Sequence, residues 1–250
     1  MAQPLLEDFL GMEIRSSTVL PATRTDITLQ TADGLSLVGE LAVPLDRPPV
    51  ATLVFLHPLP TAGGYMDSHL IRKASNRLPA LAGTATLRFN FRGVSSPRGK
   101  SEGSFGEGID EAHDLAAALR FVQEAGLPQV WLVGWSFGTE VILKHAPEHW
   151  GEFEGAILIA PPLHRASAED LAQWVGRTEP LVALVPEFDD FLTPEPARQR
   201  FATVPHAEVV AMEGAKHLFV GEKYTRMAHE AILERVAPDA LPLPTTWEKS

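Results

Sequence analysis

The pattern of hydrophobic and polar positions predicts a mostly parallel β-sheet preceded by an antiparallel hairpin. Residues 25–30 alternate between polar and apolar side chains, Asp33-Gly34 supplies a tight turn, and residues 35–43 continue as a second strand. Six short apolar runs follow, and runs of this kind are typical of strands that are buried on both faces. They cover residues 50–56, 84–91, 130–133, 156–159, 181–185 and 207–210.

Segments with a helical period lie between most of these runs. In residues 109–125, for example, Leu115, Leu119 and Val122 fall on one face of a helix, with the acidic residues 111, 114 and 124 elsewhere. Strands that alternate with helices form a parallel sheet with helices packed against it. The expected fold class is therefore α/β, with a mostly parallel sheet, an N-terminal antiparallel hairpin and helices on both faces.

Length and composition favour one domain with one large core. The chain has 250 residues, 45% of them hydrophobic, which is ordinary for a single α/β domain. We expect this domain to span residues 1–250, with irregular termini at 1–24 and 238–250. The chain contains no cysteine, so disulfides, a thiolate nucleophile and cysteine-ligated metal are excluded.

The charge balance and the apolar runs limit the classes of partner. The chain has 21 basic and 32 acidic residues and a formal net charge of -11, which opposes binding to nucleic acid or to an anionic membrane. The N-terminus does not read as a signal peptide, and no apolar run has the length of a membrane span. We expect a cytoplasmic protein that acts on a small molecule, without a nucleic-acid or membrane partner; its oligomeric state is left open.

The pentapeptide Gly134-Trp135-Ser136-Phe137-Gly138 directly follows the apolar run 130–133. A strand, a sharp turn and a helix are the context that a nucleophile elbow requires, and flanking glycines relieve the crowding at such a turn. A serine at this bend is exposed to a base and to backbone donors. Ser136 is therefore the candidate nucleophile. The alternative interpretation of the same pentapeptide is a small residue in an ordinary tight turn.

An acid and a base follow Ser136 in the chain, each just beyond a predicted strand. The run 181–185 leads into Glu187, Asp189 and Asp190, and the run 207–210 leads to His217 on a loop before the last helix. The carboxyl ends of parallel strands meet at one edge of a sheet. The order serine, acid, histidine is the order of the α/β-hydrolase architecture.

The loop after the first parallel strand is the expected source of an oxyanion site. It begins His57-Pro58-Leu59, and Pro58 has no N–H to donate. The amides of Leu59 and Phe137 are the candidate donors. We expect His57 to shape this loop rather than act as a second base. We also place His57 and Trp135 at the substrate pocket, and we expect one of the elbow aromatics, Trp135 or Phe137, to line the acyl pocket while the other packs inside.

Two further patterns have simpler interpretations than a ligand site. Residues 94–101 end in Gly-Lys-Ser like a phosphate-binding loop, but the first glycine is misplaced and the following residues cannot begin a helix. We interpret this segment as a polar loop near the site. His145 and His149 have the helical spacing of two metal ligands, yet Pro147 separates them and no third ligand is near.

Five stretches of the chain together resemble the α/β-hydrolase superfamily, and within it the small lidless serine hydrolases with an H-P-x-P oxyanion loop. The resemblance implies a triad of Ser136, Asp189 and His217 with an oxyanion hole at Leu59 and Phe137. Relatives usually have glycine at the position of Pro186, so Asp190 remains an alternative acid. The matching stretches are residues 57–60, 87–94, 134–138, 186–191 and 214–217.

The resemblance also implies a reaction. It indicates a serine hydrolase that cleaves a small carboxylic ester through an acyl-enzyme, with thioesters and amides as alternatives and with no cofactor or metal. An acyltransferase would use the same residues, and a binding protein with a silent triad is a third hypothesis. Only about twenty residues separate the strands at 156–159 and 181–185, so we expect a short helix at most in place of a lid, and an open pocket.

Overall fold

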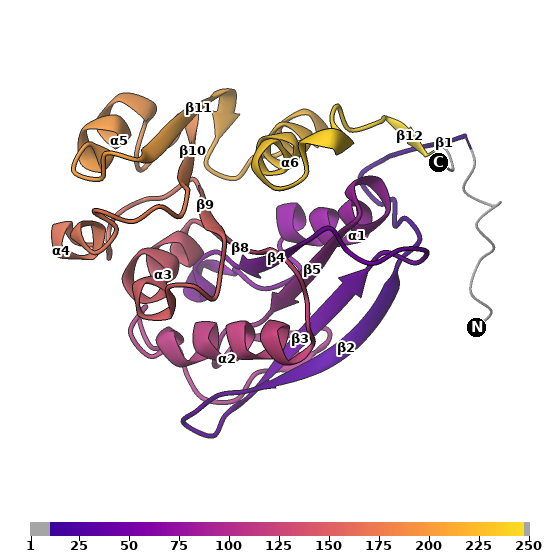
Figure 1. The fold of residues 1–250 in the computed structure, drawn as a ribbon, viewed down its shortest axis with the longest axis horizontal. Coiled ribbons are helices and arrows are strands. Elements are labelled where there is room, and N and C mark those ends of the chain that lie inside the picture. Colours follow the sequence, from indigo (N-terminus) through magenta and orange to yellow (C-terminus); the bar gives the residue numbers. More distant parts are fainter. Residues whose placement is uncertain (1–10, 248–250) are drawn as a thin grey trace.

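An eight-stranded sheet forms the centre of the protein in a computed structural model, which describes residues 11–247 (Figure 1). The strand order is β11-β10-β9-β8-β4-β5-β3-β2, in which β2 and β3 are antiparallel to their neighbours and all other pairs are parallel. The predicted fold class is confirmed. The strands are β2 (Thr23–Gln30), β3 (Ser36–Val43), β4 (Ala51–Leu56), β5 (Thr84–Phe89), β8 (Val130–Trp135), β9 (Gly155–Ile159), β10 (Leu181–Phe188) and β11 (Ala207–Lys216).

Helices cover both faces of this sheet. Helices α1 and α6 pack on one face, and α2 and α3 pack on the other, where α4 and α5 also contribute buried side chains (Figure 1). None of the helices within the described residues is both long and apolar enough to cross a membrane. The helices are α1 (His69–Ala82), α2 (Glu111–Glu124), α3 (Phe137–His145), α4 (Ala168–Ala172), α5 (Pro194–Phe201) and α6 (Glu222–Val236).

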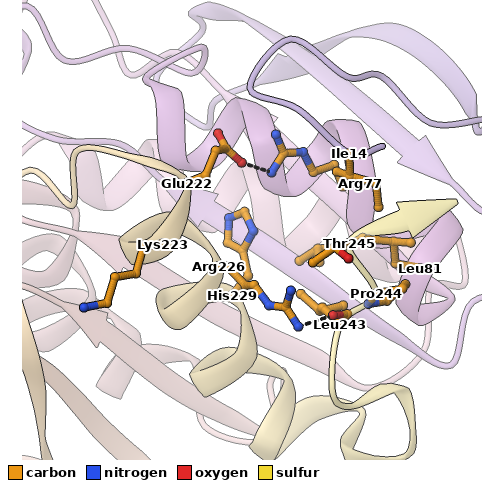
Figure 2. Close-up of a pocket in the computed structure, with 11 residues that line it drawn as sticks. Ile14, Arg77, Leu81, Glu222, Lys223, Arg226, His229, Leu243, Pro244 and Thr245 are labelled. Atoms are coloured by element: carbon orange, nitrogen blue, oxygen red, sulfur yellow. Dashed lines mark hydrogen bonds and ion pairs between the residues drawn. The ribbon is translucent and has the colours of Figure 1, made fainter. Parts of the chain in front are cut away.

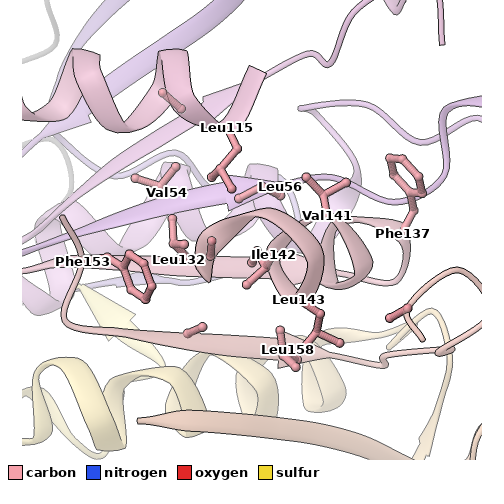
Figure 3. Close-up of a cluster of buried hydrophobic side chains, with 14 of the residues drawn as sticks. Val54, Leu56, Leu115, Leu132, Phe137, Val141, Ile142, Leu143, Phe153 and Leu158 are labelled. Atoms are coloured by element: carbon pink, nitrogen blue, oxygen red, sulfur yellow. The ribbon is translucent and has the colours of Figure 1, made fainter. Parts of the chain in front are cut away.

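The central strands divide the apolar core into two parts because successive side chains of a strand point to opposite faces. In β4, Val54 and Leu56 pack with α2 and α3, where they lie close to Leu115 (Figure 3). Leu53 and Phe55 pack in the other part of the core, with α1 and α6. The predicted burial on both faces is therefore confirmed for β4, and likewise for β5, β8 and β9, all of whose residues are buried.

The last two strands depart from the prediction. Strand β11 is largely exposed or half-buried because it lies at the edge of the sheet and has a neighbour on one side only. Strands β10 and β11 also run several residues beyond their apolar runs, to Phe188 and Lys216, with a shift of register between Pro186 and Phe188. An apolar run ends where a strand leaves the core, so the pattern underestimates such extensions.

The chain ends contain short regular elements where the sequence suggests irregular structure. Strand β1 (Met12–Glu13) pairs antiparallel with β12 (Thr246–Trp247), and Pro238–Ala240 forms a 3₁₀ helix. Burial of the Trp247 side chain explains why this segment stays against the protein. The prediction of irregular termini is thus corrected for these residues. Residues 1–10 and 248–250, which the same prediction includes, lie outside the described residues.

Two loops agree with the sequence-based interpretation. Between β9 and β10 the only helix is the five-residue α4, as expected of a protein without a lid domain. The segment that resembles a phosphate-binding loop forms a small hairpin of β6 (Ser95–Ser96) and β7 (Gly99–Lys100). No helix begins at Lys100, so the amides of a helix N-terminus do not face a phosphate there.

Candidate active site

Ser136 occupies a strained turn between β8 and α3. Its φ of 52° and ψ of -115° lie outside the regions that non-glycine residues favour, and its N–H donates to the carbonyl of Ile159 at 2.8 Å. A Cβ on Gly138 would lie 2.2 Å from the carbonyl oxygen of Leu56, and one on Gly134 would lie 2.6 Å from the backbone of Gly138. Both flanking glycines are therefore needed for this turn.

Ser136, His217 and Asp189 form one hydrogen-bonded series. The Nε2 of His217 lies 2.9 Å from the Oγ of Ser136, and its Nδ1 lies 2.8 Å from Oδ2 of Asp189. All three residues are at most 9% exposed. The other carboxylate oxygen of Asp189 accepts the backbone N–H groups of Phe191 and Leu192, which hold the carboxylate in place.

The neighbouring carboxylate takes no part in this series. Asp190 is exposed, whereas Asp189 is 8% exposed and faces the imidazole. Side chains alternate in direction along an extended chain, so only one of two adjacent carboxylates turns inward. The structure therefore brings together Ser136, Asp189 and His217, and places Asp190 in solvent.

The backbone amides of Leu59 and Phe137 are the candidate oxyanion donors. The N–H of Phe137 belongs to the first residue of α3, where helix geometry leaves it without an intrahelical acceptor. Within residues 11–247 neither this amide nor that of Leu59 donates to a protein acceptor. The Leu59 loop is tight, because Gly64 donates to the Leu59 carbonyl at 2.9 Å and a Cβ on Gly64 would overlap Pro58. This pair has the donor chemistry of an oxyanion hole.

His57 is buried behind the loop rather than facing a substrate. Its Nε2 accepts the N–H of Phe91 at 3.0 Å, so the proton is on Nδ1, which donates to the carbonyl of Pro58 at 2.7 Å. Burial lowers the pKa of His57 to about 4, against a smaller upward effect of the Pro58 hydrogen bond, so the ring is neutral. The expected role in shaping the loop agrees with these contacts, and the assignment to the substrate pocket is wrong.

Trp135 is also removed from the substrate pocket. Its side chain is 2% exposed, packs in the core with α1 and α6, and donates its indole N–H to the carbonyl of His217 at 3.2 Å. Phe137 is 1% exposed and packs against Phe91 and Phe105. Neither aromatic residue of the elbow therefore lines a surface, because both are needed to fill the two parts of the core.

Three residues near the site were missed by sequence reasoning. Buried Asn90 accepts the N–H of Met66 at 2.9 Å and thereby ties the end of the oxyanion loop to β5. The ring of Phe191 lies 4.6 Å from that of His217, and Leu218 follows His217 directly; both side chains are about half exposed. Phe191 and Leu218 could have been found in the sequence, because apolar residues directly after a predicted strand are unusual in loops, which are mostly polar.

One hollow of the protein lies beside the loop that begins at His57, and another lies between helices. An open depression of about 330 Å³ borders the oxyanion loop, lined in part by Gly63, Tyr65 and Phe105. A cavity of about 160 Å³ lies between α1, α6 and the C-terminal segment, where Arg77 pairs with Glu222 (Figure 2). Ser136, Asp189 and His217 are not among the residues that line this second cavity.

The two histidines considered as metal ligands have other partners. His145 contacts the carbonyl of Gly108 at 2.8 Å, and His149 contacts the carboxylate of Glu152 at 3.3 Å. Within the described residues no group of three or more histidine, cysteine or acidic side chains is arranged to hold a metal ion. Each of these two histidines therefore contacts a protein group rather than sharing a metal site with the other.

Similarity to known proteins agrees with this geometry. Two solved structures superpose on most of the chain: an α/β serine hydrolase homologue from Coxiella burnetii (28% identity, 85% of this chain, 97% of that one, TM-score 0.70) and an α/β serine hydrolase without a lid from Xanthomonas campestris (27%, 89%, 99%, TM-score 0.71). An uncharacterized protein from Rickettsia prowazekii is 30% identical over 119 residues, which span 47% of this chain and only 48% of that protein.

A family-level comparison covers part of the candidate site. Residues 53–202 match the model of the alpha/beta hydrolase family, and this range contains the loop that begins at His57, Ser136 and Asp189, but not His217. The match extends over more than half of the chain, and the short segment between β9 and β10 agrees with the superposition on the lidless Xanthomonas hydrolase. This protein therefore belongs to the alpha/beta hydrolase family.

Proposed function

We propose that the protein is a serine hydrolase that cleaves small carboxylic esters through an acyl-enzyme intermediate. The observation that carries the proposal is the continuous series of hydrogen bonds from Ser136 Oγ through His217 to Asp189. The amides of Leu59 and Phe137, which have no protein acceptor within residues 11–247, support it as candidate oxyanion donors. The serine hydrolase descriptions of the Coxiella and Xanthomonas proteins support the same reaction class.

The acylation step follows from the position of His217. As Ser136 Oγ bonds to the substrate carbonyl carbon, its proton passes to Nε2 of His217 at 2.9 Å. The charge that develops on the carbonyl oxygen is stabilised by the amides of Leu59 and Phe137, aided by the positive end of the α3 dipole. Asp189 stabilises the imidazolium and holds its Nδ1–H.

Bond cleavage and deacylation complete the cycle. The carbon–oxygen bond to the alcohol breaks, the leaving oxygen takes the proton from His217, and the acyl group remains on Ser136. Water then attacks the acyl-enzyme with His217 as general base, which releases the acid and restores the serine. An alcohol or amine acceptor in place of water would make the same cycle an acyl transfer, and thioesters or amides would enter by the same step.

Labelling by a fluorophosphonate probe tests the proposal. The wild-type protein should react covalently, and Ser136→Ala should not react. Asp189→Asn should lower kcat on a short-chain aryl ester by about 10⁴-fold, because the imidazole loses the tautomer that accepts the serine proton. Asp190→Asn is the matched control and should retain wild-type activity, since Asp190 is exposed.

Two results would contradict this function. Equal labelling of wild type and Ser136→Ala would show that another residue is the nucleophile. Tight binding of esters without any turnover would instead favour a binding protein. Product analysis with and without added alcohol separates hydrolysis from transfer, because only a transferase forms a new ester in preference to the acid.

A further inference from the structure

Exposed apolar side chains gather on the two loops that carry the candidate acid and base. Nine large apolar side chains are exposed within the described residues, and four of them come from residues 188–191 and 218–220. Large apolar groups that cluster in solvent usually mark a surface that binds something. These four side chains, between 52% and 69% exposed, are Phe188, Phe191, Leu218 and Val220.

The side chain of Leu218 is exposed because hydrogen bonds and a sharp turn fix the backbone of its loop. The indole of Trp135 donates to the carbonyl of His217 at 3.2 Å, and Nε2 of His69 lies 2.7 Å from the carbonyl of Leu218. Phe219 is fully buried with a φ of 48°, so the loop turns sharply and buries the residue between Leu218 and Val220. The apolar side chains next to Phe219 therefore face solvent while their backbone is fixed.

Phe191 is held against the base in the same way. Its ring centroid lies 4.6 Å from that of His217 at an interplanar angle of 72°, and its N–H is bonded to Asp189. Phe191 and Leu218 thus come from different loops and both adjoin His217. More than half of each side chain is exposed, so each has apolar surface to bury against a bound molecule.

The chemistry of the proposed reaction decides which part of a substrate meets this surface. His217 must deliver its proton to the leaving oxygen when the bond between that oxygen and the acyl carbon breaks. The alcohol portion of the ester is therefore next to the imidazole at this step, whereas the carbonyl oxygen faces Leu59 and Phe137. Apolar walls beside His217 contact the alcohol portion.

We propose that Phe191 and Leu218 form an apolar subsite for the alcohol portion, and that the substrates are esters of apolar alcohols such as longer alkyl or arylalkyl alcohols. This inference rests on the proposed hydrolase function and adds the class of leaving group to it.

Two matched ester series test the inference. In the first, acetate esters of methyl, propyl, pentyl and benzyl alcohol vary the leaving group; in the second, the methyl esters of acetic, butyric and hexanoic acid vary the acyl group. With the wild-type protein, kcat/KM should rise about twofold to fourfold per methylene of the alcohol until the subsite is filled. Leu218→Ser and Phe191→Ala should flatten this rise and leave the dependence on acyl length unchanged.

Val50→Ser provides the control, because Val50 is 53% exposed but precedes β4, at the opposite end of the strands from Ser136. It should leave both series unchanged. Equal kcat/KM for all the alcohols would overturn the subsite, and so would variants that slow every ester by one common factor. Absence of both ester cleavage and fluorophosphonate labelling would instead overturn the proposed function itself.

Discussion

His57 supports the candidate oxyanion donor Leu59 through the geometry of a single peptide group. The carbonyl of Pro58 and the N–H of Leu59 belong to one planar trans peptide and point in opposite directions. By donating to that carbonyl at 2.7 Å, His57 directs the Leu59 N–H away from the buried ring. The bond that His57 accepts from Phe91 fixes its tautomer, so β5 and the loop after β4 are locked together.

Replacing Leu59 by proline should remove one oxyanion donor with little change of backbone. The φ of Leu59 is -53°, close to the value that proline requires, so Leu59→Pro deletes the N–H without forcing a new φ. We expect kcat to fall by about 10²-fold to 10³-fold with a much smaller change in KM. Steady-state kinetics on a short-chain aryl ester measures kcat and KM separately.

Leu59→Ala is the matched control, because it loses the same side chain and keeps the N–H. It should retain most of the wild-type kcat. If both variants lost kcat to the same extent, the side chain of Leu59 rather than its amide would be responsible, and the assignment of this donor would fail. Circular dichroism of both variants verifies that they remain folded.

Among the secondary-structure elements, the extended strands β10 and β11 position the candidate acid and the candidate base. Asp189 follows the last residue of β10, and His217 follows the last residue of β11. These strands pair in parallel over most of their length, and the register shift between Pro186 and Phe188 lies just before Asp189. The exposed extensions of the two strands therefore set the distance between the carboxylate and the imidazole.

Helices α1 and α6 are joined by a carboxylate that two buried cations share. Glu222, in the first turn of α6, pairs with Lys73 and Arg77 of α1, whose side chains are 8% and 6% exposed. Burial raises the pKa of Glu222, but its contacts with Arg77 and Lys73 outweigh this effect and lower the pKa overall. The ionised carboxylate is thus the form that the folded protein prefers.

Glu222→Gln should destabilise the protein by about 1 to 3 kcal/mol, because two largely buried cations lose their counter-charge. The loss is smaller than for a fully buried ion pair because the Glu222 side chain is 40% exposed and water can reach it. Urea denaturation at pH 7 measures the loss. Since the folded pKa is lowered, this contribution is present above the unfolded pKa and should fade as the pH falls below about 4.5.

Glu208→Gln gives the comparison for an exposed ion pair. Glu208 bonds Arg235 at 2.5 Å, but their side chains are 49% and 28% exposed. We expect this variant to lose less than about 1 kcal/mol. Equal losses for the two glutamate variants would show that the contacts between α1 and α6 contribute no more than an ordinary surface pair.

For the protein as a whole, two buried neutral histidines couple folding to pH. Burial lowers the pKa of both His57 and His229 to about 4, from an ordinary value of 6.5. The unfolded chain therefore binds protons at these two sites between pH 6.5 and 4, whereas the folded protein does not. This difference makes the folded state less stable as the pH falls through that window.

We expect the free energy of unfolding to be highest above about pH 6.5 and to decrease toward pH 4, by up to roughly 1.4 kcal/mol per pH unit for each histidine. Urea denaturation at pH 7, 6 and 5 measures the slope. His229→Gln should remove about half of it, because His57 then remains as the other buried neutral histidine. A free energy that is flat between pH 7 and 5 would contradict the expectation.

Much of this architecture follows from the sequence because it depends on local periodicity. Alternation over residues 25–30 and the apolar runs that become β4, β5, β8 and β9 predict strands from side-chain direction and burial alone. The elbow is equally local, since a serine between two glycines after a strand requires only its own turn. The positions of the candidate acid and base follow from strand ends that share one edge of a parallel sheet.

Other features depend on partners that are distant in the chain, and local pattern carries no information about them. Asp189 and Asp190 are chemically equivalent neighbours, and the register of β10 against β11 turns only Asp189 toward His217. Trp135 is buried because its indole meets the His217 loop 82 residues later. His57 likewise becomes part of the support behind the site because β5 brings Phe91 to it, a contact that exists only once the sheet has assembled.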